Sequence, residues 1–421
     1  MHILMLSADA QMIDRRILQE ARTLHNAGYQ VTVLSGFECE LPDAYDDDGI
    51  AIKRYRYDWI DRRRSTFYVR WGASAAVRAG WMLYRAVNRL LDGPTAFDDF
   101  VLRKALEHRF DVVHVHDFPM LRVGVMAARA RGVPVIYDSH EFYPVQSEFP
   151  ADLQRRYLRL ERRFARQCAA VITVNPYLAR MIGEAHGIPT PEVILNASEL
   201  AEAEPVPLRE RLGFGPDDVL ILYQGWISSN RNIAVLIEAM RHLPERMKLV
   251  MVGYGDYVEV LKETARRYGL ESRVAFLGRI ESDDLPGYTV ACDIGVIPYA
   301  AVDEMHRYCS PNKLFEFIMA GIPIVANDLP YLRDVVLGHH LGETVDMASP
   351  EDLAAAIGRL VASPEKLSEV RAAVRKARDQ YNWTIEGRKL LDIYRRVLPL
   401  PPGHGTAAPT ADSQVREKEA L

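Results

Sequence analysis

The segment 310–327 reads SPNKLFEFIMAGIPIVAN and constrains the fold of this chain more than any other stretch. Ser310 is a residue type favoured at a helix N-cap, and Pro311 would then take the first helical position, where its missing N–H is not needed. Gly321 suits a helix end, and Pro323 prevents the helix from resuming. The apolar run around this proline is typical of a parallel strand covered on both faces. The segment therefore predicts a helix that feeds a buried strand.

The polar side chains of this predicted helix lie three or four residues apart, so they share one face near its start. They are Asn312, Lys313 and Glu316. Side chains lean toward a helix N-terminus, where free N–H groups and a partial positive charge favour a phosphate. Lys313 adds a cation, and Glu316, set among apolar residues, requires donors such as two ribose hydroxyls. This pattern predicts a nucleoside diphosphate site; the alternative for Glu316 is a surface helix carboxylate.

The length and composition of the whole chain limit its possible number of domains, its partners and its compartment. The 421 residues suffice for two domains with full cores, and 48% hydrophobic with 26% charged residues is typical of a globular protein. A net charge of −5 argues against nucleic acid as the main partner. The four cysteines form no CxxC pair, which favours a reducing compartment and no structural zinc. With an N-terminus that reads as a strand and no long apolar run, we expect a cytoplasmic protein.

The chain opens with a pattern typical of a βαβ unit: an apolar strand at 2–6, a helix, and a second strand at 31–34. Polar side chains follow the first strand, where Asp9 is a candidate for orienting a substrate. Arg15 and Arg16, in the first turn of the predicted helix, are candidates for an anion site. The alternative for both arginines is solvated helix charge.

Two histidines, His114 and His116, end a later strand and share one of its faces because they are two residues apart. At the carboxyl end of a parallel strand they would face the ligand crevice. The alternatives are inert strand-end histidines or a metal pair, and no further His or Cys partners cluster near them in the sequence. The next strand, 133–137, runs into a polar loop with His140 and Glu141, which are candidates for acceptor contact or for loop capping.

Residues 51–90 carry ten basic side chains and only two acidic ones. Within the segment 67–91, residues 74–91 follow a helical pattern, with apolar and aromatic residues on one side and Arg78, Arg85 and Arg89 on another. Such a helix can lie on an anionic membrane surface, which would place the protein peripherally at the inner face of the cell membrane. The alternative is an ordinary helix that packs its apolar side on its own domain.

Taken together, these motifs resemble the retaining GT-B glycosyltransferases of family 4, also called glycosyltransferase group 1. The resemblance covers roughly residues 1–398 and is strongest at 310–327 and at the HVHD motif, 114–117. It implies an α/β fold of two Rossmann-like domains whose parallel sheets face each other across a cleft. The expected parts are an acceptor-side domain (1–197), a linker (198–208), a nucleotide-sugar-binding domain (209–382), a helix crossing back to the first domain (383–398) and a disordered tail (399–421).

The resemblance also implies roles for single residues. Glu316 matches the second Glu of the family's Glu-x7-Glu motif, whereas Tyr308 stands where the first would be. His116 matches a histidine that lies against donor sugar and acceptor, so His116 and Glu316 are the expected catalytic residues. The expected donor-binding residues are Gly225, Arg231, Gly253, Ser310, Pro311, Asn312, Lys313, Leu314 and Glu316. The expected acceptor-side residues are Asp9, Arg15, His140 and Glu141.

The activity implied is hexosyl transfer with retention, from a nucleoside diphosphate sugar to a hydroxyl of a glycan, lipid-linked or small-molecule acceptor, in a setting such as polysaccharide biosynthesis. No metal or cofactor is expected, because Arg231, Lys313 and a helix N-terminus can stabilise the leaving diphosphate. UDP is favoured by family frequency, with GDP as the alternative base. Two other hypotheses stay open: a GT-B nucleotide-sugar epimerase, and a non-catalytic GT-B subunit, which Tyr308 and the lack of a second basic residue in the 225–230 loop favour.

Overall fold

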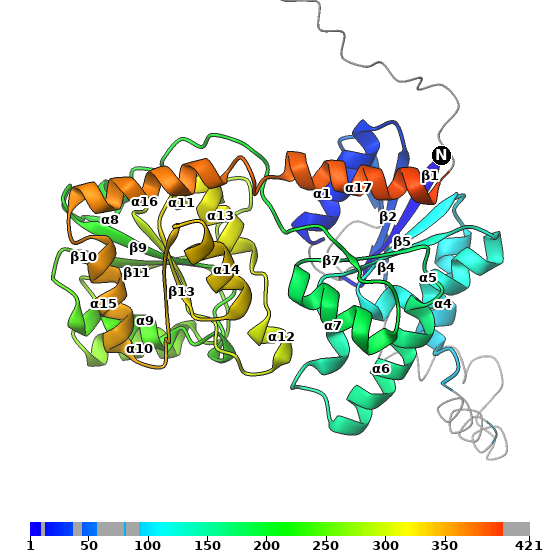
Figure 1. The fold of residues 1–421 in the computed structure, drawn as a ribbon, viewed down its shortest axis with the longest axis horizontal. Coiled ribbons are helices and arrows are strands. Elements are labelled where there is room, and N and C mark those ends of the chain that lie inside the picture. Colours follow the sequence, from blue (N-terminus) through cyan, green and yellow to red (C-terminus); the bar gives the residue numbers. More distant parts are fainter. Residues whose placement is uncertain (10–12, 37–43, 57–79, 81–91, 399–421) are drawn as a thin grey trace, which may run out of the picture.

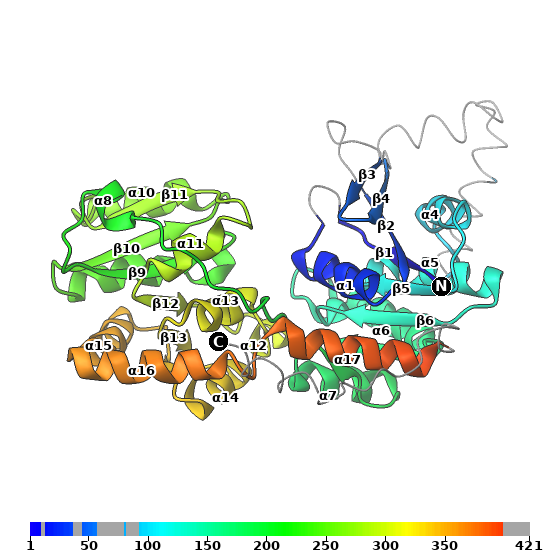
Figure 2. The same cartoon turned by 90° about the horizontal axis from the view of Figure 1, so that it is seen from above.

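The structure, a computed structural model, describes residues 1–9, 13–36, 44–56, 80 and 92–398 (Figure 1). This part of the chain forms two α/β domains that lie side by side, each built on one sheet (Figures 1 and 2). The predicted basic helix within 67–91, apart from residue 80, and the predicted tail lie outside the described residues. Among the described helices, none is both long enough and apolar enough to cross a membrane.

The first sheet has eight strands in the order β3-β4-β2-β1-β5-β6-β7-β8. Its neighbouring strands are parallel except β3 and β4, an antiparallel hairpin at the edge that the sequence analysis missed. Asp48 and Gly49 turn this hairpin with φ values of 51° and 85°, as a tight two-residue turn requires. The strands are β1 (His2–Leu6), β2 (Gln30–Gly36), β3 (Ala44–Asp47), β4 (Ile50–Tyr55), β5 (Val112–His116), β6 (Val135–Ser139), β7 (Ala170–Thr173) and β8 (Glu192–Val193).

The helices of the first domain cover both faces of this sheet and connect its parallel strands (Figure 2). α1 begins after Asp14, whose carboxylate accepts a hydrogen bond from the Arg16 backbone N–H and so caps the helix. The helical segments are α1 (Arg15–Asn26), α4 (Ala96–Leu106), α5 (Phe118–Arg131), η1 (Tyr143–Val145), α6 (Ala151–Ala165) and α7 (Pro176–His186).

The second sheet has six parallel strands in the order β11-β10-β9-β12-β13-β14. Its strands are β9 (Val219–Gln224), β10 (Met247–Val252), β11 (Val274–Gly278), β12 (Ile294–Ile297), β13 (Ile324–Asn327) and β14 (Gly342–Val345). Its helical segments are α8 (Leu208–Leu212), η2 (Ser229–Arg231), α9 (Ala234–Ala239), η3 (Met240–His242), α10 (Val258–Arg267), α11 (Leu285–Val290), α12 (Glu304–Arg307), α13 (Asn312–Ala320), α14 (Pro330–Gly338), α15 (Pro350–Leu360) and α16 (Pro364–Ala377).

Strand order reverses once in each sheet, between β1 and β5 in the first and between β9 and β12 in the second. In open α/β sheets the crevice at the carboxyl ends of the strands beside such a reversal is where ligands bind. The candidate site is therefore expected at the loops that leave β1, β5, β9 and β12.

The predicted helix and strand of segment 310–327 are present as α13 and β13, but the predicted cap is wrong. Pro311, with φ −71° and ψ 139°, occupies the N-cap, so α13 begins at Asn312. Within the part of the chain that the structure describes, the buried Ser310 hydroxyl has no hydrogen-bond partner, while the Ser310 carbonyl accepts from the side-chain amide of Asn196 in the first domain at 3.1 Å. This contact between the domains fixes the Ser310 backbone, and the Ser310 side chain does not cap α13.

The last described helix, α17 (Trp383–Val397), leaves the second domain and lies along the first (Figure 1). Its apolar face, including Trp383, Leu390 and Tyr394, joins the core formed by β1 and α1. The Trp383 indole N–H donates to the Thr23 hydroxyl at 2.8 Å, and Glu386 accepts from the Leu195 backbone N–H at 2.9 Å. The helix thus belongs to the first domain by packing although it follows the second in sequence.

Candidate active site

The polar loops of the first domain meet the predicted donor segment of the second. Arg15 Nη1 lies 3.6 Å from Glu316 Oε1, a contact between the first helix of the chain and α13. Asn196 links the domains again through the Ser310 carbonyl, at 3.1 Å. Of the predicted site residues, Arg15 of the acceptor side and Glu316 and Ser310 of the donor side therefore lie at the contact between the two domains.

Two cations lie together at the carboxyl ends of β9 and β12. Lys313 is 4% exposed, and its Nζ lies 4.0 Å from the ring centroid of Tyr223 and 4.6 Å from that of Tyr299. The Arg231 guanidinium lies 4.6 Å from the Tyr299 ring centroid and donates to the Tyr299 hydroxyl. Lys313 Nζ would also be 3.3 Å from a Cβ placed on Gly225, so the absence of a side chain there leaves room for the amine.

The ammonium of Lys313 has no hydrogen-bond partner among the described residues. Burial, followed by the nearby charge of Arg231, lowers the pKa of Lys313 well below its usual value. A buried and unpaired ammonium is costly unless an anion accepts its hydrogen bonds. The pair of cations therefore forms a site that is complete only with a bound anion.

Arg231 does not lie at the start of a helix. It ends the short 3₁₀ segment η2, and Asn232, with φ 53°, separates it from α9. A helix end does not aid anion binding here; the guanidinium itself, held by the hydroxyl and ring of Tyr299, supplies the charge.

The two predicted glycines of this region lie in loops that pack against each other. Gly225 and Gly253 follow β9 and β10 with φ values of 122° and 142°, which other residues rarely adopt. A Cβ on Gly253 would lie 1.9 Å from the Gly225 carbonyl oxygen, so the two loops pack backbone against backbone. Any side chain at Gly253 would therefore clash with the Gly225 backbone and displace one of the two loops.

Glu316 is 18% exposed on its side chain, in agreement with the site interpretation and not with a solvated surface carboxylate. Gln224 donates its amide to Glu316 Oε2, and Thr289 donates its hydroxyl to Gln224 Oε1 at 2.9 Å. Thr289 thereby sets which end of the Gln224 amide points at the carboxylate. Sequence reasoning missed both residues, because only the second sheet brings β9 and α11 beside α13.

Two further predicted donor-binding residues differ in how far their side chains are exposed to solvent. Asn312 is exposed at the first turn of α13, whereas the Leu314 side chain is fully buried in the core of the second domain. Leu314 can therefore meet a ligand only through its backbone.

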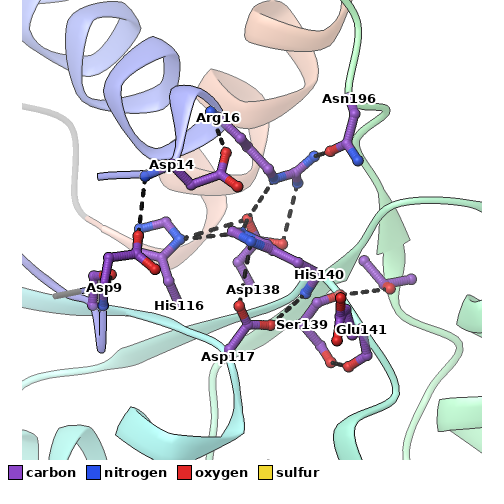
Figure 3. A network of polar contacts seen from close by, with 12 residues as sticks. Asp9, Asp14, Arg16, His116, Asp117, Asp138, Ser139, His140, Glu141 and Asn196 are labelled. Carbon is purple, nitrogen blue, oxygen red and sulfur yellow. Dashed lines mark hydrogen bonds and ion pairs between the residues drawn. The ribbon is translucent and has the colours of Figure 1, made fainter. Parts of the chain in front are cut away.

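In the first domain a buried arginine organises the strand ends (Figure 3). Arg16 holds both carboxylate oxygens of Asp138, at 2.9 and 3.1 Å, and pairs with Glu20 at 3.0 Å. It also donates to the Asn196 side chain at 3.0 Å. Of the two arginines singled out in the sequence, Arg16 is structural and buried, and Arg15 is the one that reaches the second domain.

His140 lies between two carboxylates (Figure 3). Its Nε2 is 3.1 Å from Asp138 Oδ2, its Nδ1 is 3.4 Å from Asp117 Oδ2, and its backbone N–H donates to Asp117 Oδ1 at 2.9 Å. Burial opposes the charge of His140, but Asp117 and then Asp138 outweigh it and raise the pKa of His140 to about 10. At neutral pH His140 is therefore a fixed cation in this part of the site.

His116, one of the two expected catalytic residues, is only 1% exposed. Its Nδ1 lies 3.4 Å from His140 Nε2, and its ring stacks on that of His114 at 4.4 Å. Its Nε2 has no hydrogen-bond partner in the described ranges of the chain. Burial, with the neighbouring histidines, lowers the pKa of His116 well below its usual value. His116 is thus a neutral imidazole beneath the surface of the site.

The other two acceptor-side candidates differ in direction. Asp9 is half-buried beside the start of α1, where its carboxylate accepts from the Asp14 backbone N–H at 3.0 Å. Glu141 is exposed and accepts from the Gln146 side chain at 2.6 Å, away from Asp117 (Figure 3). Asp9 therefore lies at the start of α1, whereas Glu141 belongs to the loop that follows β6.

The two histidines of the HVHD motif have acidic neighbours that the sequence analysis did not expect. Potential metal-ligand atoms of Glu20, His114, His116 and Asp138 all lie within 4.8 Å of one another. Arg16 Nε, however, lies 3.0 Å from Glu20 and 2.9 Å from Asp138, so a guanidinium already balances both carboxylates. The absence of a metal at this site stays a prediction.

Tyr308, which stands where the family has its first Glu, makes a contact between domains. Its ring stacks on that of Tyr177 at 5.2 Å and 15°, and its carbonyl accepts from the Asn175 side-chain amide at 2.8 Å. An aromatic ring at this position joins the domains, in place of a carboxylate that could bind a sugar hydroxyl.

A cavity of about 740 Å³ lies elsewhere, beneath the segment 205–208 of the second domain. Two of its lining arginines, Arg209 and Arg371, bind the carboxylate of Asp293, which precedes β12. The cavity therefore lies at the opposite end of β12 from Lys313 and Arg231.

Comparison with known proteins agrees with this architecture. Residues 13–197 match the family model described as Glycosyl transferase 4-like domain, and residues 207–377 match Glycosyl transferases group 1. Solved structures with the same fold include Anabaena HepE in complex with UDP and glucose, with TM-score 0.68, 18% identity and coverage of 94% of this chain and 100% of that one. WaaG, a glycosyltransferase involved in lipopolysaccharide biosynthesis, matches with TM-score 0.62 and 15% identity over 93% of this chain and 99% of that one.

Sequence relatives are glycosyltransferases as well. The D-inositol 3-phosphate glycosyltransferase of Xylanimonas cellulosilytica is 29% identical over 340 residues, 73% of this chain and 78% of that protein. The phosphatidyl-myo-inositol mannosyltransferase of Mycolicibacterium smegmatis is 22% identical over 391 residues, 91% of this chain and 90% of that protein. The chain therefore belongs to the glycosyltransferase group 1 family and has an N-terminal glycosyl transferase 4-like domain. It is a glycosyltransferase of the GT-B fold.

Proposed function

We propose that this protein is a retaining glycosyltransferase that moves a sugar from a nucleoside diphosphate sugar to an acceptor hydroxyl. The observation that carries the proposal is the pair of Lys313 and Arg231, because the buried Lys313 ammonium has no hydrogen-bond partner among the described residues and a bound anion would supply one. In this proposal both cations face the negative charge that develops on the departing diphosphate. Fixed charges in a site shielded from water stabilise such a leaving group strongly.

In this proposal Glu316 binds the ribose of the donor. Gln224 holds one oxygen of its carboxylate, and Arg15 lies 3.6 Å from the other. Ribose hydroxyls would donate to that oxygen and displace the Arg15 guanidinium, which couples donor binding to the contact between the two domains. The Gly225 and Gly253 loops leave room for the phosphates by exposing backbone instead of side chains.

UDP is the base we favour. Anabaena HepE was solved with UDP and with UDP-glucose, and the Escherichia coli trehalose-6-phosphate protein was solved with UDP-2-fluoro glucose. One sequence relative is named GDP-mannose-dependent, so GDP is the alternative. No metal is needed in this proposal, because Lys313 and Arg231 supply the positive charge.

The acceptor we favour is a polyol or lipid-linked hydroxyl. The relatives include enzymes named for inositol 3-phosphate, phosphatidyl-myo-inositol and monoglucosyldiacylglycerol. A basic, aromatic segment at 67–91 that contacts the inner face of the cell membrane would suit such an acceptor, and this membrane contact is part of the proposal.

A second candidate is a non-catalytic subunit that binds nucleotide sugars. It is favoured by one observation: Tyr308 stands at the first Glu position and is engaged with Tyr177. Such a protein would bind the nucleotide but release no nucleoside diphosphate from the sugar donor, whatever hydroxyl compound is supplied.

A thermal-shift panel of UDP, GDP and ADP, with and without EDTA, tests the proposal. A ligand at a hundred times its Kd stabilises the folded state by about 2.7 kcal/mol, which raises the melting temperature measurably. We expect a shift with UDP that resists EDTA and is lost in Glu316→Ala. The matched control is Glu369→Ala, which removes an exposed carboxylate on α16. No shift with any nucleotide would refute the proposal.

A further inference from the structure

The helix α6 and its C-cap carry a dense run of basic side chains on the surface of the first domain. The arginines of this run are Arg155, Arg156, Arg159, Arg162, Arg163 and Arg166. All of them except Arg156 are exposed, and these exposed side chains form what we call the arginine face. The chain as a whole has a net charge of −5, so this face is opposite in sign to the molecule that carries it.

The spacing of the arginines gathers their charge on one side of the helix. Arg155, Arg159 and Arg163 are four residues apart, so they follow one another along a single stripe. Like charges at this spacing repel and destabilise a helix. Basic residues in the last turn, such as Arg163, gain from the helix dipole, but Arg155 and Arg159 lie too far from that end. The stability of α6 therefore does not explain the stripe.

The protein itself neutralises little of the arginine face. Asp92 lies 4.0 Å from Arg159, whose side chain is still 65% exposed. Glu161, the acidic residue within the run, is fully buried and does not reach the surface. Among the described residues, no carboxylate lies within ion-pair distance of Arg155 or Arg163. The face is therefore free to pair with anions outside the chain.

Aromatic rings adjoin the start of α6. The Phe149 ring lies 5.2 Å from that of Tyr143 and 5.3 Å from that of Tyr157 on α6, and Phe118 lies 5.1 Å from Tyr157. All four side chains are partly exposed, and together they form what we call the aromatic cluster. Aromatic side chains beside basic ones are typical of protein surfaces that lie in the headgroup region of a bilayer.

The arginine face also adjoins the end of the basic segment 67–91. Asp92 directly follows that segment in the chain, and its carboxylate accepts from Arg156 of α6 at 2.8 Å. The buried side of α6 packs on the core that includes α5, on the opposite face of the sheet from α17 (Figure 1). The last residue of contact with the segment and the arginine face thus belong to one side of the first domain.

The first turn of α6 is tied to the predicted acceptor side. The Gln154 side chain donates to the carbonyls of Gln146 and Phe149, at 3.0 and 3.1 Å. Both belong to the loop that begins at His140, and the next residue of that loop, Ser147, donates its backbone N–H to Asp303 of the second domain at 3.0 Å. A surface that binds α6 therefore lies beside this loop.

We propose that the arginine face, with the aromatic cluster beside its first turn, is a docking surface for a bilayer of anionic phospholipid. The inference rests on the proposed function, whose membrane contact it extends to a second, structurally described surface. Guanidinium groups match the geometry of lipid phosphates, and the aromatic rings suit the headgroup region. Docking would bring the loop of His140 to the membrane surface, where the hydroxyl of a lipid-linked acceptor lies.

Co-sedimentation of the full chain with lipid vesicles tests the proposal. The vesicles are phosphatidylcholine alone, or phosphatidylcholine mixed with phosphatidylglycerol, and we expect wild type to bind only the mixed ones. A basic residue near an anionic surface strengthens binding about fivefold. Arg155→Gln should therefore weaken binding about fivefold, and the triple variant Arg155→Gln, Arg159→Gln, Arg163→Gln about a hundredfold. Melting curves check the fold of the triple variant, and Arg155→Gln, which removes no ion pair among the described residues, decides if the triple variant is unstable.

The control removes the same charge from the second domain. The triple variant Arg246→Gln, Arg266→Gln, Arg267→Gln changes exposed arginines and should bind the mixed vesicles as wild type does. Binding should fall as the salt concentration rises from about 0.15 M to about 1 M, because the Debye length shrinks from about 8 to about 3 Å. Phe149→Ser should reduce the binding that remains at high salt, since that part depends on the aromatic cluster.

Two results would overturn the inference and leave nucleotide-sugar transfer untouched. One is wild-type affinity of the α6 variants for the mixed vesicles, which would assign the membrane contact to another surface. The other is absence of wild-type binding to these vesicles; binding to heparin instead would indicate a soluble polyanion as the partner. The thermal shift with UDP separates these failures from that of the proposed function. It should be equal in wild type and the α6 triple variant, and no shift in wild type with any nucleotide would refute the proposed function and this inference with it.

Discussion

Lys313 shows how one residue can oppose stability in the free protein and favour ligand binding. Its ammonium is buried over two tyrosine rings and has no hydrogen-bond partner among the described residues. A methionine of similar length would fill the same space without a charge to bury. The cost of the lysine would be offset only when an anion occupies the site.

We therefore expect Lys313→Met to raise the melting temperature of the ligand-free protein and to weaken UDP binding. A hydrogen bond between charged groups contributes about 1.5–3 kcal/mol, so the Kd of UDP should rise roughly 10–100-fold. Calorimetric titration and a melting curve measure the two effects. The control is Lys366→Met on the exposed face of α16. An unchanged Kd of UDP would show that Lys313 does not contact the diphosphate.

His140 should make stability depend on pH. Asp117 and Asp138 raise its pKa in the folded protein to about 10 against the opposing effect of burial, whereas its ordinary value is 6.5. The folded state then binds more protons than the unfolded state between these pH values. The stabilisation is complete below about pH 6.5 and is lost as the pH rises toward 10, at up to about 1.4 kcal/mol per pH unit.

The measurement is urea unfolding of wild type and His140→Gln from pH 6 to 10. We expect the difference in the free energy of unfolding between them to be largest at pH 6 and to shrink steadily above it. His242→Gln, which removes a half-exposed histidine that pairs with Glu351 on the surface, serves as the comparison. A difference that grows with pH would mean that His140 is neutral in the folded state.

At the scale of the element, α17 shows that position in the sequence and membership of a domain can differ. Trp383, at its start, is 6% exposed in the core of the first domain and donates its indole N–H to Thr23. The helix ties the end of the described chain to its first helix, so the first domain can be complete only after the second has been synthesised.

We expect Trp383→Ala to lower the free energy of unfolding by about 3–5 kcal/mol, because it removes a large buried side chain and leaves a cavity. Trp383→Phe keeps most of the apolar contact and loses the bond to Thr23, at a cost of about 1 kcal/mol. Urea denaturation followed at the two domains separately would measure both. A loss confined to the second domain would contradict the packing described for α17.

At the scale of the whole molecule, aromatic and polar side chains join the two domains. Tyr177 stacks on Tyr308 and donates its hydroxyl to Asp334 at 2.7 Å. Ser147 and Gln146 of the first domain also contact the α12 region of the second. Together with the bond from Asn196 to the Ser310 carbonyl, these contacts hold the two domains close together.

Tyr177→Ala removes both the stack and the hydrogen bond to Asp334. We expect a larger radius of gyration in the ligand-free protein by small-angle X-ray scattering, and a larger compaction when UDP is added. Affinity for UDP should change little, since the residues proposed to bind it lie in the second domain, whereas transfer should slow because closure is needed to bring acceptor and donor together. Arg180→Ala, an exposed change on the same helix, is the control. An unchanged radius in Tyr177→Ala would show that other contacts hold the domains.

Much of the architecture could be predicted from residues close together in the chain. The segment 310–327 predicted α13 and β13, since helix stops and apolar strand runs act within a few positions. The resemblance supplied the GT-B fold, which the comparisons confirm. The predicted cap at Ser310 is wrong because of a distant contact. The Ser310 carbonyl accepts a hydrogen bond from Asn196, which lies more than a hundred positions away in the chain.

By itself the sequence determined which elements form, which ends of the strands carry polar residues, and which family the chain belongs to. Only the tertiary structure decided how those residues combine. Arg16 meets Asp138 across 122 positions, and Gln224 meets Glu316 across 92. Asp117 likewise meets the loop of His140 across 23 positions, where its carboxylate accepts from the His140 backbone N–H. The physical reason is that periodicity and capping are local, whereas the order of strands in a sheet sets which distant side chains share a site.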